Sequence, residues 1–164
     1  MSMALREFGD RIAIAEVLAR YCRHLDEMNL DGIPPLFTRD CLVSYGPDPL
    51  LESHGAEALA RSLQRLWRWS RTSHHLSNIE ISFDDDAHAR VRSYVIAWHE
   101  RDDGSTATLF GSYCDEFLRD GEIWRIARRR QEMHGSDAGF RVNLHRLARR
   151  PPPRGWQPPQ IDGR

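Results

Sequence analysis

Residues 73–133 read SHHLSNIEISFDDDAHARVRSYVIAWHERDDGSTATLFGSYCDEFLRDGEIWRIARRRQEM. Four segments of this stretch have the composition and alternation of β-strands, and they span Ser73–Phe83, Ala87–Glu100, Ser105–Leu118 and Glu122–Met133. The three short separators between them carry the Asp and Gly residues that tight hairpin turns need. The stretch therefore predicts four strands that pair antiparallel in chain order.

The residues before this stretch predict helices. The segment Leu5–Met28 carries one apolar stripe at helical spacing, formed by Ile14, Val17, Leu18, Tyr21 and Leu25. Shorter elements follow: we expect a single turn at Ile33–Phe37, strands at Cys41–Tyr45 and Leu50–Glu52, and a helix from Ser53 or His54 to Trp69. Helices followed by strands indicate an α+β fold in which the helices pack on one face of a curved sheet.

The pattern of helices and strands ends at His134. We therefore assign residues 1–134 to one domain and residues 135–164 to a C-terminal arm rich in Pro and Arg, which holds five of the nine prolines. Two interpretations of the arm stay open, a disordered tail or a segment that crosses a neighbouring subunit. The second is favoured by apolar residues that a solvated tail has little reason to carry: Phe140, Val142, Leu144, Leu147 and Trp156.

Composition excludes several classes of function. The chain has 164 residues, 40% of them hydrophobic, which is enough for one domain with its own core. Its 23 basic and 24 acidic residues nearly cancel, which argues against nucleic-acid or membrane binding and favours a small ligand. Every basic residue is Arg, so no lysine can form a Schiff base with a substrate.

The compartment is predicted from cysteine usage and from the apolar runs. The three cysteines are widely spaced, and we expect free thiols in a reducing cytosol. No signal-peptide pattern opens the chain, and no apolar run approaches the roughly 18 residues of a membrane span. We expect a soluble cytoplasmic protein.

Asp26, His74 and His75 are the first candidates for chemistry. Asp26 lies beside the apolar stripe of the first helix, where a carboxylate needs a partner to stay charged, and a histidine partner would make acid–base chemistry possible. His74 and His75 are adjacent in a strand, so they face opposite sides and one of them points inward. Strict alternation groups His75 with the apolar residues of its strand, whereas a bulge near Ser77 would reverse that assignment.

The segment Arg128–Arg130 follows a buried strand pattern, with Arg129 on the face opposite to its two neighbours. At least one of these arginines should reach inward, where it could pair a carboxylate or stabilise an oxyanion; a charged sheet edge is the alternative. Tyr21 lies about 140° around the helix from Asp26 and would share only a flank of the same cavity. No histidine or acid shows metal-ligand spacing on one element, so we expect no metal site.

Four segments taken together resemble a known family. In chain order they are residues 21–26 (YCRHLD), 36–40 (LFTRD), 72–79 (TSHHLSNI) and 124–129 (WRIARR). Their order and spacing are similar to the SnoaL-like branch of the nuclear transport factor 2-like superfamily, over about Leu5 to His134. The resemblance implies a cone-shaped, curved antiparallel sheet, an α+β barrel, with N-terminal helices that close a deep apolar pocket. It also implies a homodimer or a homotrimer.

Within this family, cofactor-free lyases such as scytalone dehydratase, hexachlorocyclohexane dehydrochlorinase and bile acid 7α-dehydratase use a helix Asp, a strand His and often a late Arg and a Tyr. By resemblance these roles fall on Asp26, His74, Arg129 and Tyr21, with His74 as general base, Asp26 as its partner, and Arg129 or Tyr21 stabilising an oxyanion. A second acid of the bile acid enzyme would fall near Ala97, which argues against a bile acid substrate.

The expected ligand is a small cyclic or polycyclic, mostly apolar molecule, such as a polyketide, terpenoid, steroid or aromatic metabolite. The expected wall of its pocket consists of Tyr45, Trp67, His75, Trp98 and Phe110. A dehydratase or isomerase that needs no cofactor is the favoured function. Two alternatives stay open: a polyketide cyclase, and a non-catalytic binding or assembly module, because residues 71–130 also resemble the β subunits of aromatic-ring dioxygenases.

Overall fold

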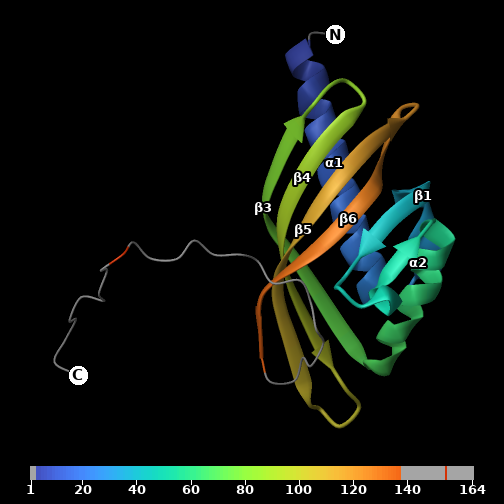
Figure 1. Ribbon diagram of the computed structural model, residues 1–164, viewed down its shortest axis with the longest axis vertical. Coiled ribbons are helices and arrows are strands. Elements are labelled where there is room, and N and C mark those ends of the chain that lie inside the picture. The colour runs from blue at the N-terminus through green and yellow to red at the C-terminus, as the bar shows by residue number, and fades with distance from the viewer. Residues whose placement is uncertain (1–2, 138–153, 155–164) are drawn as a thin grey trace.

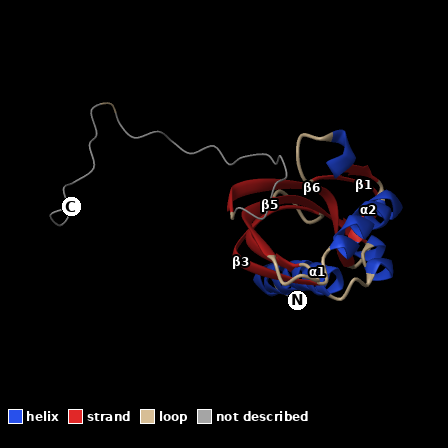
Figure 2. Cartoon of the chain, turned by 90° about the horizontal axis from the view of Figure 1, so that it is seen from below, coloured by secondary structure: helices blue, strands red, loops and turns tan. Residues whose placement is uncertain are grey.

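The computed structural model describes residues 3–137 and Arg154, and within them one long helix lies along a curved six-stranded sheet (Figure 1 and Figure 2). The helices are α1 (Met3–Asp26) and α2 (Ala56–Leu63). The strands are β1 (Phe37–Ser44), β2 (Glu52–His54), β3 (Arg71–Phe83), β4 (His88–Glu100), β5 (Thr106–Asp120) and β6 (Ile123–Ser136). Short 3₁₀ turns lie at Leu30–Gly32, Pro34–Leu36, Pro49–Leu51 and Gln64–Arg68.

The strand order of the sheet is β2-β1-β6-β5-β4-β3. The prediction of an α+β fold with a curved sheet is confirmed, and β3 to β6 pair antiparallel in chain order as the sequence indicates. Two details differ. Strand β1 pairs parallel with β6, because no hairpin joins these two strands and fixes their relative direction. The sheet is also open rather than a closed barrel, with β2 and β3 at its edges.

Helix α1 lies across the concave side of the sheet, where it packs on β3 and β6 (Figure 2). The apolar stripe predicted for this helix is buried along its whole length and consists of Ile14, Val17, Leu18, Tyr21 and Leu25. Helix and sheet therefore enclose the space that holds the candidate site. Among the described residues, no helix is long and apolar enough to span a membrane.

Several element boundaries differ from the prediction. The helix expected from Ser53 or His54 to Trp69 is shorter, because both starting residues pair with β1 in β2 and because α2 ends at Leu63 in a 3₁₀ turn. The strand expected at Leu50–Glu52 is instead mostly a 3₁₀ turn. Strand β6 continues to Ser136, so it includes the first residues assigned to the arm. The five apolar residues predicted to dock the arm lie outside the described residues.

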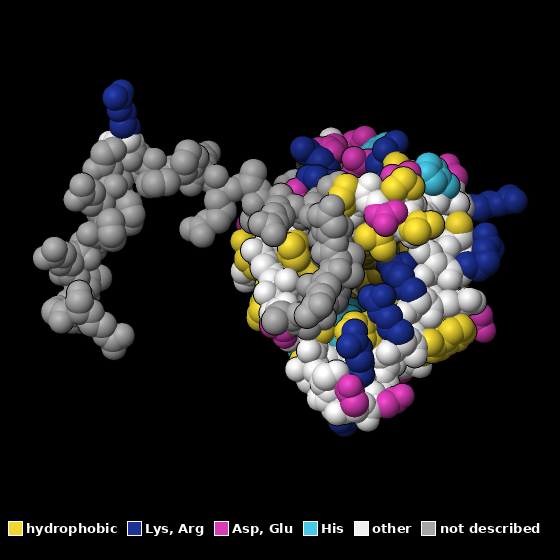
Figure 3. All heavy atoms as spheres, turned by 60° about the horizontal axis from the view of Figure 1, so that its bottom comes forward, with side chains coloured by type: hydrophobic (Ala, Val, Ile, Leu, Met, Phe, Trp, Pro, Cys, Tyr) yellow, Lys and Arg dark blue, Asp and Glu magenta, His cyan; other side chains and the backbone are white. Residues whose placement is uncertain are grey.

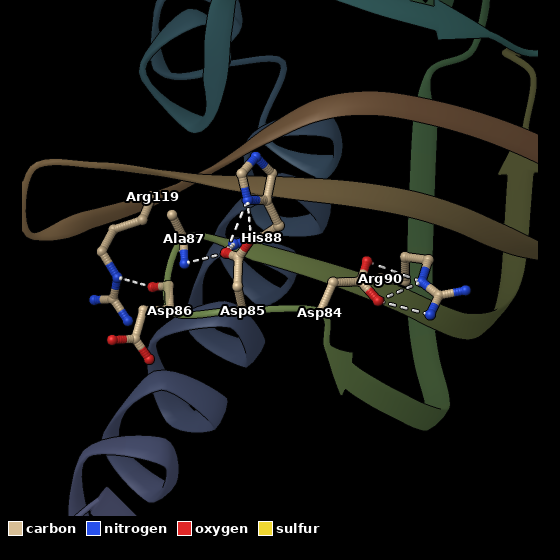
Figure 4. Close-up of polar contacts among 7 residues, drawn as sticks. All are labelled: Asp84, Asp85, Asp86, Ala87, His88, Arg90 and Arg119. Atoms are coloured by element: carbon tan, nitrogen blue, oxygen red, sulfur yellow. Dashed lines mark hydrogen bonds and ion pairs between the residues drawn. The ribbon is translucent and has the colours of Figure 1, made fainter.

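Two kinds of turn close the hairpins. The β4–β5 and β5–β6 turns use Gly104 and Gly121, with φ angles of 78° and 64°, as the Asp-Gly signals predict. The β3–β4 turn has no glycine, and its Asp side chains accept hydrogen bonds instead (Figure 4). Asp85 accepts from the backbone N–H groups of Ala87 and His88, at 2.7 and 2.8 Å.

A β-bulge at Asn78 sets which face of β3 points inward. Ser77 pairs with Tyr94 and Glu80 with Arg92, so β3 has one residue more than β4 between these pairs. Asn78 takes a φ of 50°, in the left-handed region that Asn tolerates better than most residues. The bulge therefore reverses the alternation, and His74 faces inward while His75 is exposed.

We predict that Asn78→Val lowers the free energy of unfolding by about 1–2 kcal/mol, because a β-branched residue is strained at a positive φ. Asn78→Gly keeps the bulge without that strain and is expected to stay within about 0.5 kcal/mol of the wild type. Urea denaturation followed by circular dichroism measures both. Equal stability of the Val and Gly variants would contradict this account of the bulge.

Candidate active site

Asp26 ends helix α1 and meets the first residues of β3. Its carboxylate accepts three hydrogen bonds: Thr72 Oγ1 and the His74 backbone N–H donate over 2.9 Å each, and His74 Nδ1 lies 2.6 Å from Asp26 Oδ1. The His74 side chain is 5% exposed and that of Asp26 is 27% exposed. The structure therefore brings the predicted helix carboxylate and strand imidazole into direct contact.

The hydrogen bonds of Asp26 keep its carboxylate ionised and orient the His74 ring. Burial alone would raise the pKa of Asp26, but the hydrogen bonds and charge of His74, together with the Thr72 hydroxyl, outweigh it and lower the pKa below its usual value. An ionised carboxylate only accepts hydrogen bonds, so His74 Nδ1 carries the proton. His74 Nε2 is the ring nitrogen that does not contact Asp26.

A cavity of about 470 Å³ adjoins His74 on the inner face of the sheet. Its polar wall includes Tyr21, Tyr45 and Tyr113, and the hydroxyls of Tyr21 and Tyr45 form a short hydrogen bond with each other. Burial raises the pKa of all three phenols, so they stay protonated and act as hydrogen-bond donors or acceptors rather than as bases. Apolar side chains such as Leu25, Leu63 and Leu109 line most of the remaining wall.

His99 of β4 also lines this cavity, although it is not among the residues predicted for the site. Its ring stands edge-on to that of His74, with centroids 5.6 Å apart, and lies 5.0 Å from the ring of Trp69. Burial, followed by the charge of His74, lowers the pKa of His99 to about 4. The alternation of side chains along β4 could have indicated this position, since His99 shares a face with the buried residues of the strand.

Arg129 points inward but stands behind the cavity wall. Its Nε and Nη2 donate to the two carboxylate oxygens of Asp115, at 2.8 and 2.7 Å, and both side chains are fully buried. The guanidinium lies 4.3 Å from the ring centre of Tyr21 and 4.1 Å from that of Tyr113. The charge of Asp115 outweighs burial and raises the pKa of Arg129 well above its ordinary value, so the guanidinium is a permanent cation.

The predicted wall residues divide into two groups. Tyr45 lines the cavity, and Tyr21 does so as well. The other four do not. His75 is exposed in a groove between α1 and β3, Trp67 is 61% exposed, and Trp98 and Phe110 lie on the outer face of the sheet, where Phe110 is 45% exposed. For Trp98 the reason is that side chains alternate between the two faces of a strand, and Trp98 shares the face of β4 that carries the exposed Arg90.

Two further classes of chemistry can be assessed from the side chains. The cysteines are free, and burial raises the pKa of Cys22 to about 12 and that of Cys41 to about 11, so neither is a reactive thiolate at neutral pH. Within the described part of the chain, no group of three or more His, Cys, Asp and Glu side chains converges as metal ligands would.

The curved sheet, the long covering helix and the enclosed cavity define a protein of the nuclear transport factor 2-like fold. The sequence profile of the SnoaL-like domain matches residues 6–130, and the chain belongs to this family. The family resemblance noted from the sequence is therefore confirmed.

Three solved structures show the same fold. A protein of Novosphingobium aromaticivorans assigned as a scytalone dehydratase is 28% identical with a TM-score of 0.85, over 91% of this chain and 100% of that chain. A hexachlorocyclohexane dehydrochlorinase of Novosphingobium barchaimii is 16% identical with a TM-score of 0.72, over 89% and 99%. A β subunit assigned to an aromatic-ring-hydroxylating dioxygenase of N. aromaticivorans is 19% identical with a TM-score of 0.65, over 87% and 93%.

We predict that Asp115→Asn lowers the free energy of unfolding by about 3–5 kcal/mol, because it leaves the buried Arg129 cation without a counter-charge. Glu116→Gln is the matched control, since Glu116 is the next residue and pairs with Arg128 on the exposed face. That control should stay within about 0.5 kcal/mol of the wild type. Chemical denaturation measures both values, and similar losses in the two variants would contradict the importance assigned to the buried pair.

We also predict that His99 makes the protein less stable in mild acid. The unfolded chain protonates this histidine near its ordinary pKa of 6.5, whereas the folded state does so only near 4, so stability falls as the pH falls between these values. The two pKa values limit the loss to about 3 kcal/mol. His99→Gln should flatten this part of the stability–pH curve, and His88→Gln, at an exposed turn, should not. Identical curves for wild type and His99→Gln would overturn the prediction.

Proposed function

We propose that this protein is a cofactor-independent lyase or isomerase of the dehydratase type, which acts on a small cyclic and largely apolar substrate. The observation that carries the proposal is the 2.6 Å contact between His74 Nδ1 and Asp26 beside a cavity of about 470 Å³. An imidazole held in one tautomer by a carboxylate, with its other nitrogen available, is suited to general base catalysis.

In the proposed reaction, His74 Nε2 removes a proton from a carbon next to a carbonyl group. The electron pair of that C–H bond forms the new C=C bond, and the C–O bond of the neighbouring carbon breaks with its electron pair on oxygen. The proton held on His74 then returns to this oxygen, so one water is released and the imidazole is regenerated. An isomerase would return the proton to carbon instead. Asp26 stabilises the imidazolium in both cases.

The paired hydroxyls of Tyr21 and Tyr45 are proposed to bind the substrate oxygen that gains negative charge. Both phenols stay protonated in the cavity, and a preorganised O–H donor in a site of low dielectric stabilises an oxyanion strongly. Arg129 is a positioning residue in this scheme, because it contacts the Tyr21 ring and is not among the residues that line the cavity.

The solved relatives support this class of reaction. The neighbour with the highest identity among the three described above is assigned as a scytalone dehydratase, and a second is a dehydrochlorinase. Loss of water and loss of HCl share the same first requirement, a base that removes a proton from carbon. The fold likeness at 16% identity supports the architecture alone, so the case for catalysis depends on the geometry around His74.

We predict that His74→Ala lowers kcat for water loss at least about a hundredfold, because it removes the general base. Asp26→Asn should lower kcat as well, since it removes the charge that stabilises the imidazolium. A practical panel is 3-hydroxycyclohexanone and its bicyclic homologues, with water loss followed by the absorbance of the enone product. His75→Ala is the matched control, because His75 is exposed outside the cavity, and it should keep wild-type kcat.

Two outcomes of this assay would contradict the proposed role of His74: turnover unchanged in His74→Ala, or an equal loss in His75→Ala. Circular dichroism of each variant separates loss of chemistry from loss of fold. This control is needed above all for Asp26→Asn, because Asp26 also joins α1 to β3.

A non-catalytic assembly module is the second candidate, and the likeness to a dioxygenase β subunit favours it. In that role His74 would be a structural histidine of the sheet. Copurification with an oxygenase chain, together with no turnover across the whole panel, would support it. A polyketide cyclase would use the same cavity, and ring closure of a polyketide ester without water loss would identify it. The homodimer or homotrimer remains a prediction that light scattering can test.

A further inference from the structure

The cavity opens toward a group of arginines at its mouth. Its inner wall is buried, whereas Leu50, at 83% exposure, and Arg68 mark the side that faces solvent. Figure 3 shows Arg side chains gathered beside a hollow on the face that carries the β4–β5 turn. We define the arginine rim as Arg65 and Arg68, which line the cavity, together with Arg101, which contacts the same Trp69 ring as Arg68.

The local structure brings these three side chains together. Arg65 and Arg68 are three residues apart in the 3₁₀ turn Gln64–Arg68, and such residues lie one above the other on a 3₁₀ helix. Both line the cavity. The guanidiniums of Arg68 and Arg101 lie 5.3 and 4.8 Å from the ring centre of Trp69. Burial, and after it the charges of Arg65 and Arg101, lower the pKa of Arg68.

The arginine rim has no carboxylate within ion-pair distance among the described residues. Among the described residues, none of its three side chains forms an ion pair with Asp or Glu, whereas the nearby Arg71 is paired with Glu100. Two carboxylates lie near the rim without contacting it: Asp48 lines the cavity and accepts a hydrogen bond from the Leu50 backbone, and Asp103 accepts one from the Ser105 backbone. The hydrogen bonds from Ser105, together with the charge of Arg101, lower the pKa of Asp103. Like charges gathered without partners cost free energy, which an anionic ligand would offset.

A short chain of side-chain contacts separates the rim from the proposed base, His74. Three successive side-chain contacts lead from His74 to His99, then to Trp69, and then to Arg68 and Arg101, and each is 5.6 Å or shorter. A ligand that spans the cavity would therefore reach the rim several bonds away from the carbon that reacts.

We propose that the substrate carries an anionic group, a carboxylate or a phosphate, which binds the arginine rim while its cyclic part lies against His74. The inference rests on the proposed function for the reaction, but its binding component can be tested without turnover. Arginine is suited to this role because its planar fork of N–H donors matches carboxylate and phosphate oxygens.

The test compares an unreactive matched pair, 2-naphthoate and 2-naphthamide, by isothermal titration calorimetry at low ionic strength. We expect 2-naphthoate to bind at least about tenfold more tightly, as one charge-assisted hydrogen bond would provide. Arg68→Gln and Arg101→Gln should each weaken 2-naphthoate binding, and the double variant should reduce the preference further while 2-naphthamide binds as before. Arg68→Lys lacks the planar fork and loses its proton more readily among like charges, so it should retain only part of the preference.

Arg61→Gln is the control, because Arg61 is an exposed arginine of α2 that does not line the cavity. Equal affinity of the wild type for both compounds would overturn the inference, and so would an equal loss of preference in Arg61→Gln. A second pair, 2-naphthyl phosphate and 2-naphthol, identifies the anion: tighter binding of the phosphate than of the carboxylate assigns a phosphate, and the reverse assigns a carboxylate.

The two proposals can fail separately. A preference for the anion, with no turnover either in the panel or with ring-carboxylated members of it, supports the rim and contradicts the lyase. Turnover that depends on His74, with equal binding of the charged and neutral compounds, supports the lyase and contradicts the rim.

Discussion

The junction between Asp26 and β3 is the interaction on which both the fold and the site depend. Strand β3 is an edge of the sheet, and its open side would carry unpaired backbone groups. Asp26 accepts hydrogen bonds from Thr72 and from both the backbone and the ring of His74, so the end of helix α1 holds the start of this edge strand. Asp10 has a similar position near the other end of the helix, where it accepts a hydrogen bond from Trp124 and pairs with Arg119. The same contacts that fix the helix on the sheet also fix the tautomer of the candidate base.

The buried ion pair of Arg129 and Asp115 changes the role that the family resemblance implies for Arg129. A cation in the interior loses its hydration, and here a two-point ion pair and two flanking aromatic rings offset that loss. Such a guanidinium cannot swing toward a substrate without leaving Asp115 unpaired. Its effect on the cavity is therefore indirect, through the position and the electrostatic environment of Tyr21 and Tyr113. The cavity wall therefore carries the hydroxyl pair of Tyr21 and Tyr45, whereas Arg129 stands behind it.

Features that rest on a pattern repeated over many residues were predictable from the sequence. Features that depend on one inserted residue were not. The α1 stripe and the hairpin order of β3 to β6 follow from repeated signals, so a few atypical residues do not obscure them. The inward orientation of His74 instead depends on one extra residue at Asn78, which alternation allows but cannot place. The partner of Arg129 could have been found, since Asp115 is a lone acid among inward-facing residues of β5. The outward position of Trp98 was also available from its alternation with buried Ala97 and His99, but a preference for aromatic pocket walls outweighed it.

The distribution of charge in the cavity limits which group can act as the base. The three tyrosines stay protonated, and His99 stays neutral above its pKa of about 4, so the inner wall carries polar groups without net charge apart from the His74–Asp26 pair. The cations lie at the mouth, and they are arginines, as is every basic residue of the chain. This matters because a ligand that covers the mouth also removes water from it. A lysine among like charges loses its proton readily under such conditions, whereas an arginine starts from a much higher pKa and keeps its charge even when burial lowers that pKa. The arginine rim can therefore keep its charge, and its attraction for the anionic group of the substrate, while the bound substrate covers the mouth of the cavity.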